Sequence, residues 1–261
     1  MMRAKKSLGQ HWLKDETSLT AICDAAELTH KDIVLEIGPG LGSLTNHLVQ
    51  RAGKVIAIEL DENLTKDIPL KVPADNLEVM QGDILKFDLT QLPFGYKVVA
   101  NIPYYLTSNL IRILSESPNP PLAMVLLVQK EVAHRIAAEP GEMSLLSVSA
   151  QLYYQPQLGL EVKAELFEPP PKVDSQVIIL KQHKIPLFEN LDTKLYFRVI
   201  KAGFAGRRKK LRSSLAAGLR ISKTEADGLL QSAELDGNLR AQNLSLKDWH
   251  KLYNACKTAN I

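Results

Sequence analysis

The sequence is poor in the features that build disulfide frameworks, zinc sites and membrane spans. Its two cysteines, Cys23 and Cys256, lie far apart without a metal-ligating partner at zinc spacing, so neither a disulfide framework nor a metal site is expected. The longest apolar run, residues 122–128, has the length of a buried strand. The first twenty residues are basic and polar, without a signal-peptide core. These absences predict a cytoplasmic protein with no membrane anchor.

The net charge is small but unevenly distributed. There are 32 basic and 29 acidic residues, giving a net charge of +3. Proteins with and without a nucleic-acid partner carry as much charge, so this value alone excludes neither class. Between Lys201 and Lys223, however, there are eight basic residues and no acidic one. This asymmetry favours a polyanionic partner, although a solvated charged surface is the common alternative.

Short β-rich runs alternate with helix-like stretches in the first half of the chain. The runs cover residues 33–37, 55–59, 77–81, 97–100 and 123–128. This alternation is typical of βαβ units on a mostly parallel sheet. Two more runs, 158–163 and 176–180, lack a helical pattern between them and predict an antiparallel hairpin at one edge of the sheet.

The strand pattern ends near residue 183, and the remainder is helical. Ser222 and Glu225 have the spacing of a capping box, and Ser245 precedes an apolar stripe at helical spacing. The expected fold class is therefore α/β: a Rossmann-like domain at residues 1–183 and a small all-helical domain at residues 190–261.

A glycine-rich turn follows the first strand. Gly38, Gly40 and Gly42 form G-x-G-x-G, whereas a dinucleotide fold favours G-x-G-x-x-G. Such glycines let the backbone approach a ligand at a helix amino terminus. The second strand ends at Glu59, which is placed to accept from ribose hydroxyls, and the third ends at Asp83 and Ile84, where Asp83 is placed to accept from an adenine amine. Together these strand ends predict a cleft for a nucleoside-type cofactor.

The fourth strand runs into Asn101-Ile102-Pro103-Tyr104. An adenine N6 amine is a poor nucleophile because its lone pair is delocalised. The amide oxygen of Asn101 and a backbone carbonyl of Ile102 or Pro103 would accept from its two N–H bonds and favour reactive geometry. Pro103 fixes the carbonyl direction, and Tyr104 offers a face for an extruded base. A helix cap and a rigid turn would be the better explanation of a lone N-x-P-Y, but the position after the fourth strand, downstream of a G-x-G-x-G turn, favours the catalytic role.

With these motifs the sequence resembles the rRNA adenine N6-dimethyltransferases, the KsgA-type enzymes, with the Erm resistance methyltransferases as more distant relatives. The resemblance covers nearly the whole chain. Besides the glycine turn and Asn101–Tyr105, it rests on blocks at residues 6–13, 128–133, 167–175 and 204–212.

The resemblance implies a class I fold and S-adenosyl-L-methionine as methyl donor. It implies that Gln10, His11 and Leu13 fold over the cofactor, and that Gly38 lies near its methionine part. Asn101 would touch both cofactor and target, and Phe167 would stack on the base opposite Tyr104, although by position alone Phe167 resembles a core anchor. Two departures are Trp12, where the family usually has phenylalanine, and a short stretch at residues 139–144; we expect neither to abolish activity.

The basic segment is expected to bind RNA from a helix anchored by Phe204, Leu211, Leu215 and Leu219. The candidate phosphate-binding residues are Arg207, Arg208, Lys209, Lys210 and Arg212.

The resemblance further implies that a monomer dimethylates two adjacent adenosines near the 3′ end of small-subunit (16S) rRNA in an immature ribosomal subunit. An Erm-type enzyme acting on large-subunit rRNA, an assembly checkpoint factor with secondary methylation, and an NAD-dependent oxidoreductase stay open as alternatives.

Overall fold

The chain folds into two compact units. The computed structural model describes residue 5, residues 8–206 and residues 208–261. The first unit comprises Met1–His134 and Tyr154–Gln182, and the second comprises Arg135–Tyr153 and His183–Ile261. The expected division placed residues 135–153 in the first domain, whereas in the structure they belong to the helical unit.

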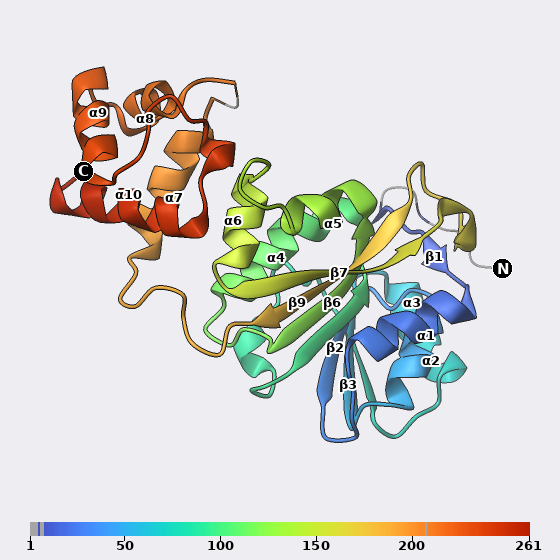
Figure 1. Cartoon of the computed structure of the whole chain (residues 1–261). Helices are drawn as coiled ribbons and strands as arrows, with labels where there is room; N and C mark the ends of the chain where they lie inside the picture. The colour runs from blue at the N-terminus through green and yellow to red at the C-terminus, as the bar shows by residue number, and fades with distance from the viewer. Residues whose placement is uncertain (1–4, 6–7, 207) are drawn as a thin grey trace. The chain divides into compact units, whose positions relative to one another are not determined.

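The first unit is built on a seven-stranded sheet with the order β4-β3-β2-β5-β6-β9-β7. The strands are β2 (Ile33–Ile37), β3 (Lys54–Glu59), β4 (Leu77–Gln81), β5 (Lys97–Asn101), β6 (Ala123–Gln129), β7 (Tyr154–Val162) and β9 (Ser175–Gln182). The first five pair in parallel, whereas β9 pairs antiparallel with both β6 and β7. The predicted Rossmann-like α/β fold with an antiparallel edge hairpin is confirmed (Figure 1).

Helix α1 (Glu16–Ala25) precedes β2, and α2 (Ser43–Val49), α3 (Glu62–Lys71), α4 (Thr107–Glu116) and α5 (Lys130–Ile136) come after β2, β3, β5 and β6. Short 3₁₀ turns lie at η2 (Leu89–Gln91), η3 (Tyr104–Leu106) and η4 (Ala164–Leu166). Alternate strand residues such as Val34, Val55, Val99 and Val125 share a buried cluster with α1 and α2. Because side chains alternate along a strand, this cluster marks one face of the sheet.

A second, two-stranded sheet holds the amino-terminal segment. β1 (Trp12–Leu13) pairs antiparallel with β8 (Phe167–Glu168), with Trp12 opposite Glu168 and Leu13 opposite Phe167. The Lys14 ammonium also pairs with the Glu168 carboxylate. This pairing joins segments about 150 residues apart, and no local pattern predicted it.

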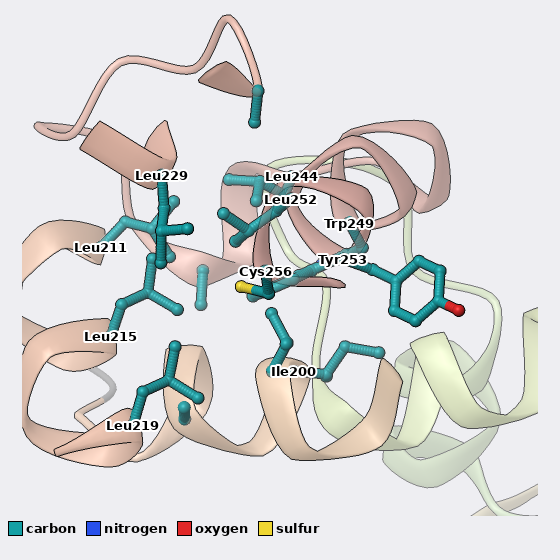
Figure 2. Packing of buried hydrophobic residues seen from close by; sticks show 14 of the residues in the cluster. Ile200, Leu211, Leu215, Leu219, Leu229, Leu244, Trp249, Leu252, Tyr253 and Cys256 are labelled. Carbon is teal, nitrogen blue, oxygen red and sulfur yellow. The ribbon is translucent and has the colours of Figure 1, made fainter. Parts of the chain in front are cut away.

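The second unit is helical. It contains α6 (Leu145–Gln151), α7 (Thr193–Phe204), α8 (Leu211–Leu219), α9 (Lys223–Ser232), η5 (Ala241–Asn243) and α10 (Leu246–Thr258). Its core gathers Leu211, Leu215 and Leu219 of α8 with Trp249 and Cys256 of α10 (Figure 2).

The ends of these helices follow the sequence closely. Ser222 and Glu225 form the predicted capping box of α9, and Ser245 caps α10 with Asp248. The short stretch at residues 139–144 is a turn that exchanges hydrogen bonds with Gln242: the Gly141 N–H donates to the Gln242 carbonyl, and the Gln242 amide donates back to the Gly141 carbonyl. Packing against Gln242 therefore accommodates the short loop within the helical unit.

Among the described residues, no helix combines the length and apolar character that a membrane span requires. The same residues contain no cluster of histidine, cysteine and carboxylate side chains arranged to hold a metal ion.

Candidate active site

A cavity opens at the carboxyl ends of the parallel strands, where β2 and β5 lie next to each other although β3 and β4 separate them in sequence. Such a reversal of strand order is the usual ligand position in open α/β sheets. The cavity lining comes from the amino-terminal segment, the glycine turn and the ends of β3, β4 and β5. It includes all nine residues predicted to bind the cofactor: Gln10, His11, Leu13, Gly38, Gly40, Glu59, Asp83, Ile84 and Asn101.

The glycine turn forms one wall of this cavity. Gly38 and Gly40 have φ values of +66° and +60°, a region that side chains with a Cβ rarely adopt. A Cβ on Gly40 would lie 3.0 Å from Trp12 Cδ1, because the indole of Trp12 packs over the turn. The larger ring at position 12 is thus accommodated by the absence of a side chain at position 40.

Glu59 is anchored by the backbone. Its Oε2 accepts from the Gly40 N–H at 3.2 Å, and its Oε1 accepts from the Asp61 N–H at 2.9 Å. The residue is only 5% exposed, and this burial raises the pKa of its carboxyl. Each oxygen retains further acceptor capacity, so Glu59 can receive two hydroxyl groups on the cavity side.

Glu36 is a cavity residue that the sequence analysis missed. It lies in β2 among apolar neighbours, is 1% exposed and lines the cavity. Its Oε2 has no hydrogen-bond partner among the described residues. Burial, with a further contribution from nearby Glu59, raises the pKa of this carboxyl to about 8. A carboxylate inside an otherwise apolar strand just before the glycine turn was the available signal.

Asn101 ends β5 at the cavity, and its amide group is oriented by the amino-terminal segment. The Nδ2 donates to the backbone carbonyl of His11 at 3.1 Å. Since a carbonyl only accepts, this contact assigns the NH₂ group to His11 and leaves Oδ1 as the free acceptor. The Pro103 carbonyl accepts from the Leu106 N–H at 3.0 Å, which favours the Ile102 carbonyl as the second acceptor.

Two contacts fix the side chain of Tyr104, one at its hydroxyl and one at a face of its ring. Its hydroxyl is hydrogen-bonded to the buried Ser175 hydroxyl at 2.7 Å. One face of its ring stacks on His11, with a centroid distance of 5.8 Å and an interplanar angle of 18°. The imidazole of His11 is itself held by a bond between Nδ1 and the Pro169 carbonyl at 2.7 Å. The other face of the Tyr104 ring is therefore the one available to a target base.

Phe167 is buried in this structure, and its stacking on a target base stays a prediction of the resemblance. The residue is 4% exposed, packs in the core cluster beneath the sheet face and does not line the cavity. Its pairing with Leu13 in the small sheet directs it into the protein. In this structure Phe167 packs in the core, as its sequence position alone suggested, and contact with a base would require its ring to become exposed.

The basic segment forms the turn between α7 and α8 and the start of α8. Arg208, Lys209 and Lys210 are exposed, whereas Arg212 is half-buried and pairs with Asp227 at 3.2 Å. Lys210 donates to the Asn238 amide oxygen at 2.7 Å. Arg207 lies outside the described residues. The buried leucines of α8 anchor the segment as expected.

Comparison with known proteins identifies the family of the chain. Residues 1–258 match the family model described as ribosomal RNA adenine dimethylase. The chain belongs to this family. As the sequence analysis expected, it is an S-adenosyl-L-methionine-dependent methyltransferase of ribosomal RNA adenines.

Curated relatives support the same assignment. The protein named ribosomal RNA small subunit methyltransferase A in Dehalococcoides mccartyi strain CBDB1 is 41% identical to this chain, over 96% of this chain and 88% of the relative. The protein of that name in Listeria monocytogenes serotype 4b is 38% identical, over 96% and 90%.

Two solved structures are similar to this chain in fold. A dimethyladenosine transferase from Plasmodium falciparum superposes with a TM-score of 0.83 and 28% identity, covering 96% of this chain and 99% of that one. The 23S rRNA methyltransferase ErmE superposes with a TM-score of 0.76 and 28% identity, covering 94% and 99%. Both the dimethyladenosine transferase and the Erm branch are thus similar in fold to this member of the adenine dimethylase family.

Proposed function

We propose that this adenine dimethylase transfers methyl groups to the N6 amines of two adjacent adenosines near the 3′ end of small-subunit rRNA. It acts as a monomer on an immature small ribosomal subunit in the cytoplasm. The observation that carries the proposal is the hydrogen bond from the NH₂ group of Asn101 to the His11 carbonyl, which leaves Oδ1 as the available acceptor of a residue that lines the cavity.

The residues of the cavity fit the methyl donor. The backbone of Gly38 and Gly40 leaves room for a close approach, and Glu59 is placed to accept from ribose hydroxyls. The unpartnered Oε2 of Glu36 suits a cationic amino group. Asp83, whose Oδ1 accepts from the Leu85 N–H at 3.0 Å, has a second oxygen for an adenine amine. When bound, S-adenosyl-L-methionine supplies an electrophilic methyl group.

The chain's own groups orient the target amine. Asn101 Oδ1 and the Ile102 carbonyl accept from the two N–H bonds of adenine N6, which shifts the nitrogen toward the geometry in which its lone pair is available. Tyr104 stacks on the extruded base with a ring that Ser175 and His11 hold still. No strong base is required at this site, because the proton leaves from an amine that methylation has made cationic.

The small-subunit substrate is preferred over the Erm-type alternative. The curated relatives at 38–41% identity are named for the small subunit. The proposal places the RNA phosphates on the basic α7–α8 turn, where Arg208, Lys209 and Lys210 are exposed.

Two variants test the proposed site. Asn101→Ala removes the acceptor and is expected to lower kcat by about 10²–10³-fold. Glu59→Ala removes the ribose contact and is expected mainly to raise the KM for S-adenosyl-L-methionine. Radiolabelled methyl transfer to unmethylated small subunits measures both parameters. A kcat for Asn101→Ala within a few-fold of wild type would remove Asn101 from the reaction.

The same Asn101→Ala variant separates an enzyme from an assembly checkpoint. A checkpoint factor would bind immature subunits normally and restore subunit maturation in cells without turnover. We expect this variant to bind the subunits but not to restore their maturation, because its effect in cells depends on turnover.

A further inference from the structure

Tyr105 is an exposed aromatic residue at the mouth of the cavity. It is 62% exposed, and it lines the cavity together with Asn101 and Tyr104. Its hydroxyl makes no hydrogen bond with the described part of the chain, in contrast to the hydroxyl of Tyr104, which Ser175 holds. A large aromatic ring that is exposed beside a base pocket is free to make a contact that the protein itself does not make.

The backbone directs the two tyrosines to different sides. Both lie in η3, a single 3₁₀ turn, in which successive residues point about 120° apart. Tyr104 turns inward to Ser175 and His11, and Tyr105 therefore turns toward the opening.

Gly9 supports the ring of Tyr105 from the protein side. It has a φ of +61°, and a Cβ built there would lie 3.4 Å from Cδ1 and Cε1 of Tyr105. The glycine thus lets one edge of the ring lie against the amino-terminal segment. The ring is held at that edge while most of its surface stays open to solvent.

When RNA binds at this site, the nucleotide next to the target adenosine lacks a stacking partner. When the target adenosine leaves the stack to enter the cavity, the adjacent nucleotide loses a stacking partner. An exposed aromatic ring replaces such a partner for any of the bases, since each base has a π face. Tyr105 directly follows Tyr104 and lines the same cavity, so a second aromatic ring is available one residue from the ring that is proposed to stack on the target base.

We propose that Tyr105 stacks on the nucleotide adjacent to the target adenosine and holds it at the mouth of the cavity. This inference rests on the proposed function, because it assigns a second contact to the same RNA. In a substrate with two adjacent adenosines, the adenosine waiting for or leaving the pocket is the one that Tyr105 contacts.

A double-mutant cycle tests this contact. The substrate is a small-subunit rRNA 3′-terminal fragment with two adjacent adenosines, prepared intact or with an abasic nucleotide on the 5′ or the 3′ side of the target. The kcat/KM for RNA is measured at saturating S-adenosyl-L-methionine for wild type, Tyr105→Leu and Tyr105→Phe. Phe94→Ala is the matched control, because Phe94 is 85% exposed on the same unit but does not line the cavity.

On intact RNA, Tyr105→Leu is expected to lower kcat/KM by at least about fivefold, while Tyr105→Phe and Phe94→Ala stay within about twofold. The KM for S-adenosyl-L-methionine should not change. One of the two abasic substrates should lower the wild-type value by a similar factor and should show no further loss with Tyr105→Leu.

The inference is overturned if Tyr105→Leu equals wild type on intact RNA, or if the two losses multiply on both abasic substrates. Thermal unfolding and S-adenosylhomocysteine binding show whether the variant is folded; if Tyr105→Leu is not, Tyr105→Gln completes the cycle. If wild type does not methylate the intact fragment, equilibrium binding of the same three RNAs to wild type and variant gives the same comparison. Failure of wild type to methylate intact unmethylated small subunits would count against the proposed function instead.

Discussion

At the scale of single residues, the cavity is held by contacts that cross long stretches of sequence. His11 makes three of them: its carbonyl holds Asn101, its ring stacks on Tyr104, and its Nδ1 bonds to the Pro169 carbonyl. The sequence predicted that His11 belongs to the site only through family resemblance. Its actual contacts depend on tertiary packing, which no local pattern encodes.

The missed Glu36 and the burial of Phe167 have the same explanation. Glu36 was hidden in an apolar strand, and strand periodicity treats such a position as core. Phe167 is buried by the pairing of β1 with β8, a non-local contact. By contrast, Gly38, Glu59 and Asp83 were predicted to lie in one cleft because parallel strands bring their carboxyl ends to one edge of the sheet.

Glu36 predicts a pH dependence of stability. Its pKa is about 8 in the folded protein against about 4.5 for a free glutamate, so the folded state binds this proton more tightly than the unfolded state does. The free energy of unfolding therefore loses a contribution as pH rises between those two values. We expect Glu36→Gln, without cofactor, to flatten the decline of Tm between about pH 5.5 and 8.5 and to melt above wild type at the upper end.

Differential scanning calorimetry without cofactor measures this effect, since each kcal/mol of unfolding free energy shifts the Tm of a protein of this size by ~2–4 °C. Glu189→Gln, at an exposed position outside the cavity, is the control and should follow the wild-type curve. A Glu36→Gln curve parallel to that of wild type would show that this carboxyl does not titrate in the window.

At the scale of elements, the strands were more predictable than the boundary between the units. Buried strands carry continuous β-rich runs, so the bounds of β2 and β4 agree with the predicted runs and the others differ by a few residues. Residues 135–153 have no composition that distinguishes them from other helix-forming segments. They join the helical unit because Met143, Val148 and Leu152 complete its core.

The contact between α7 and α8 predicts opposite effects for two glycines. A Cβ on Gly218 would lie 2.5 Å from Ala202 Cα, whereas a Cβ on Gly228 in α9 meets nothing within 4 Å. Gly218→Ala is expected to destabilise the helical unit by ~1–3 kcal/mol, because backbone must move. Gly228→Ala is expected to stabilise it by up to about 1 kcal/mol.

Urea unfolding followed by circular dichroism measures both variants. Each is the other's control, since both place the same methyl group on a helix of the same unit. Equal effects of the two substitutions would contradict the close packing of α7 against α8.

At the scale of the whole molecule, a net charge of +3 conceals a local cationic surface. Replacing Arg208 and Lys209 with glutamate should weaken RNA binding and reduce the slope of log K against log salt by about one unit for each phosphate that is no longer neutralised. A control with the same charge change, Lys54→Glu with Lys66→Glu, alters exposed lysines of the first unit. Filter binding over a salt series measures the slopes, and identical slopes for both double variants would remove the α7–α8 turn from the RNA site.

The identity of the methylated nucleoside tests the central claim most directly. The protein is incubated with S-adenosyl-L-methionine and either unmethylated small subunits or large-subunit rRNA, and the RNA is digested for mass spectrometry. We predict N6,N6-dimethyladenosine at two adjacent positions near the 3′ end of the small-subunit rRNA. Dimethyladenosine in large-subunit rRNA alone, or no methylated adenosine in either RNA, would contradict the account.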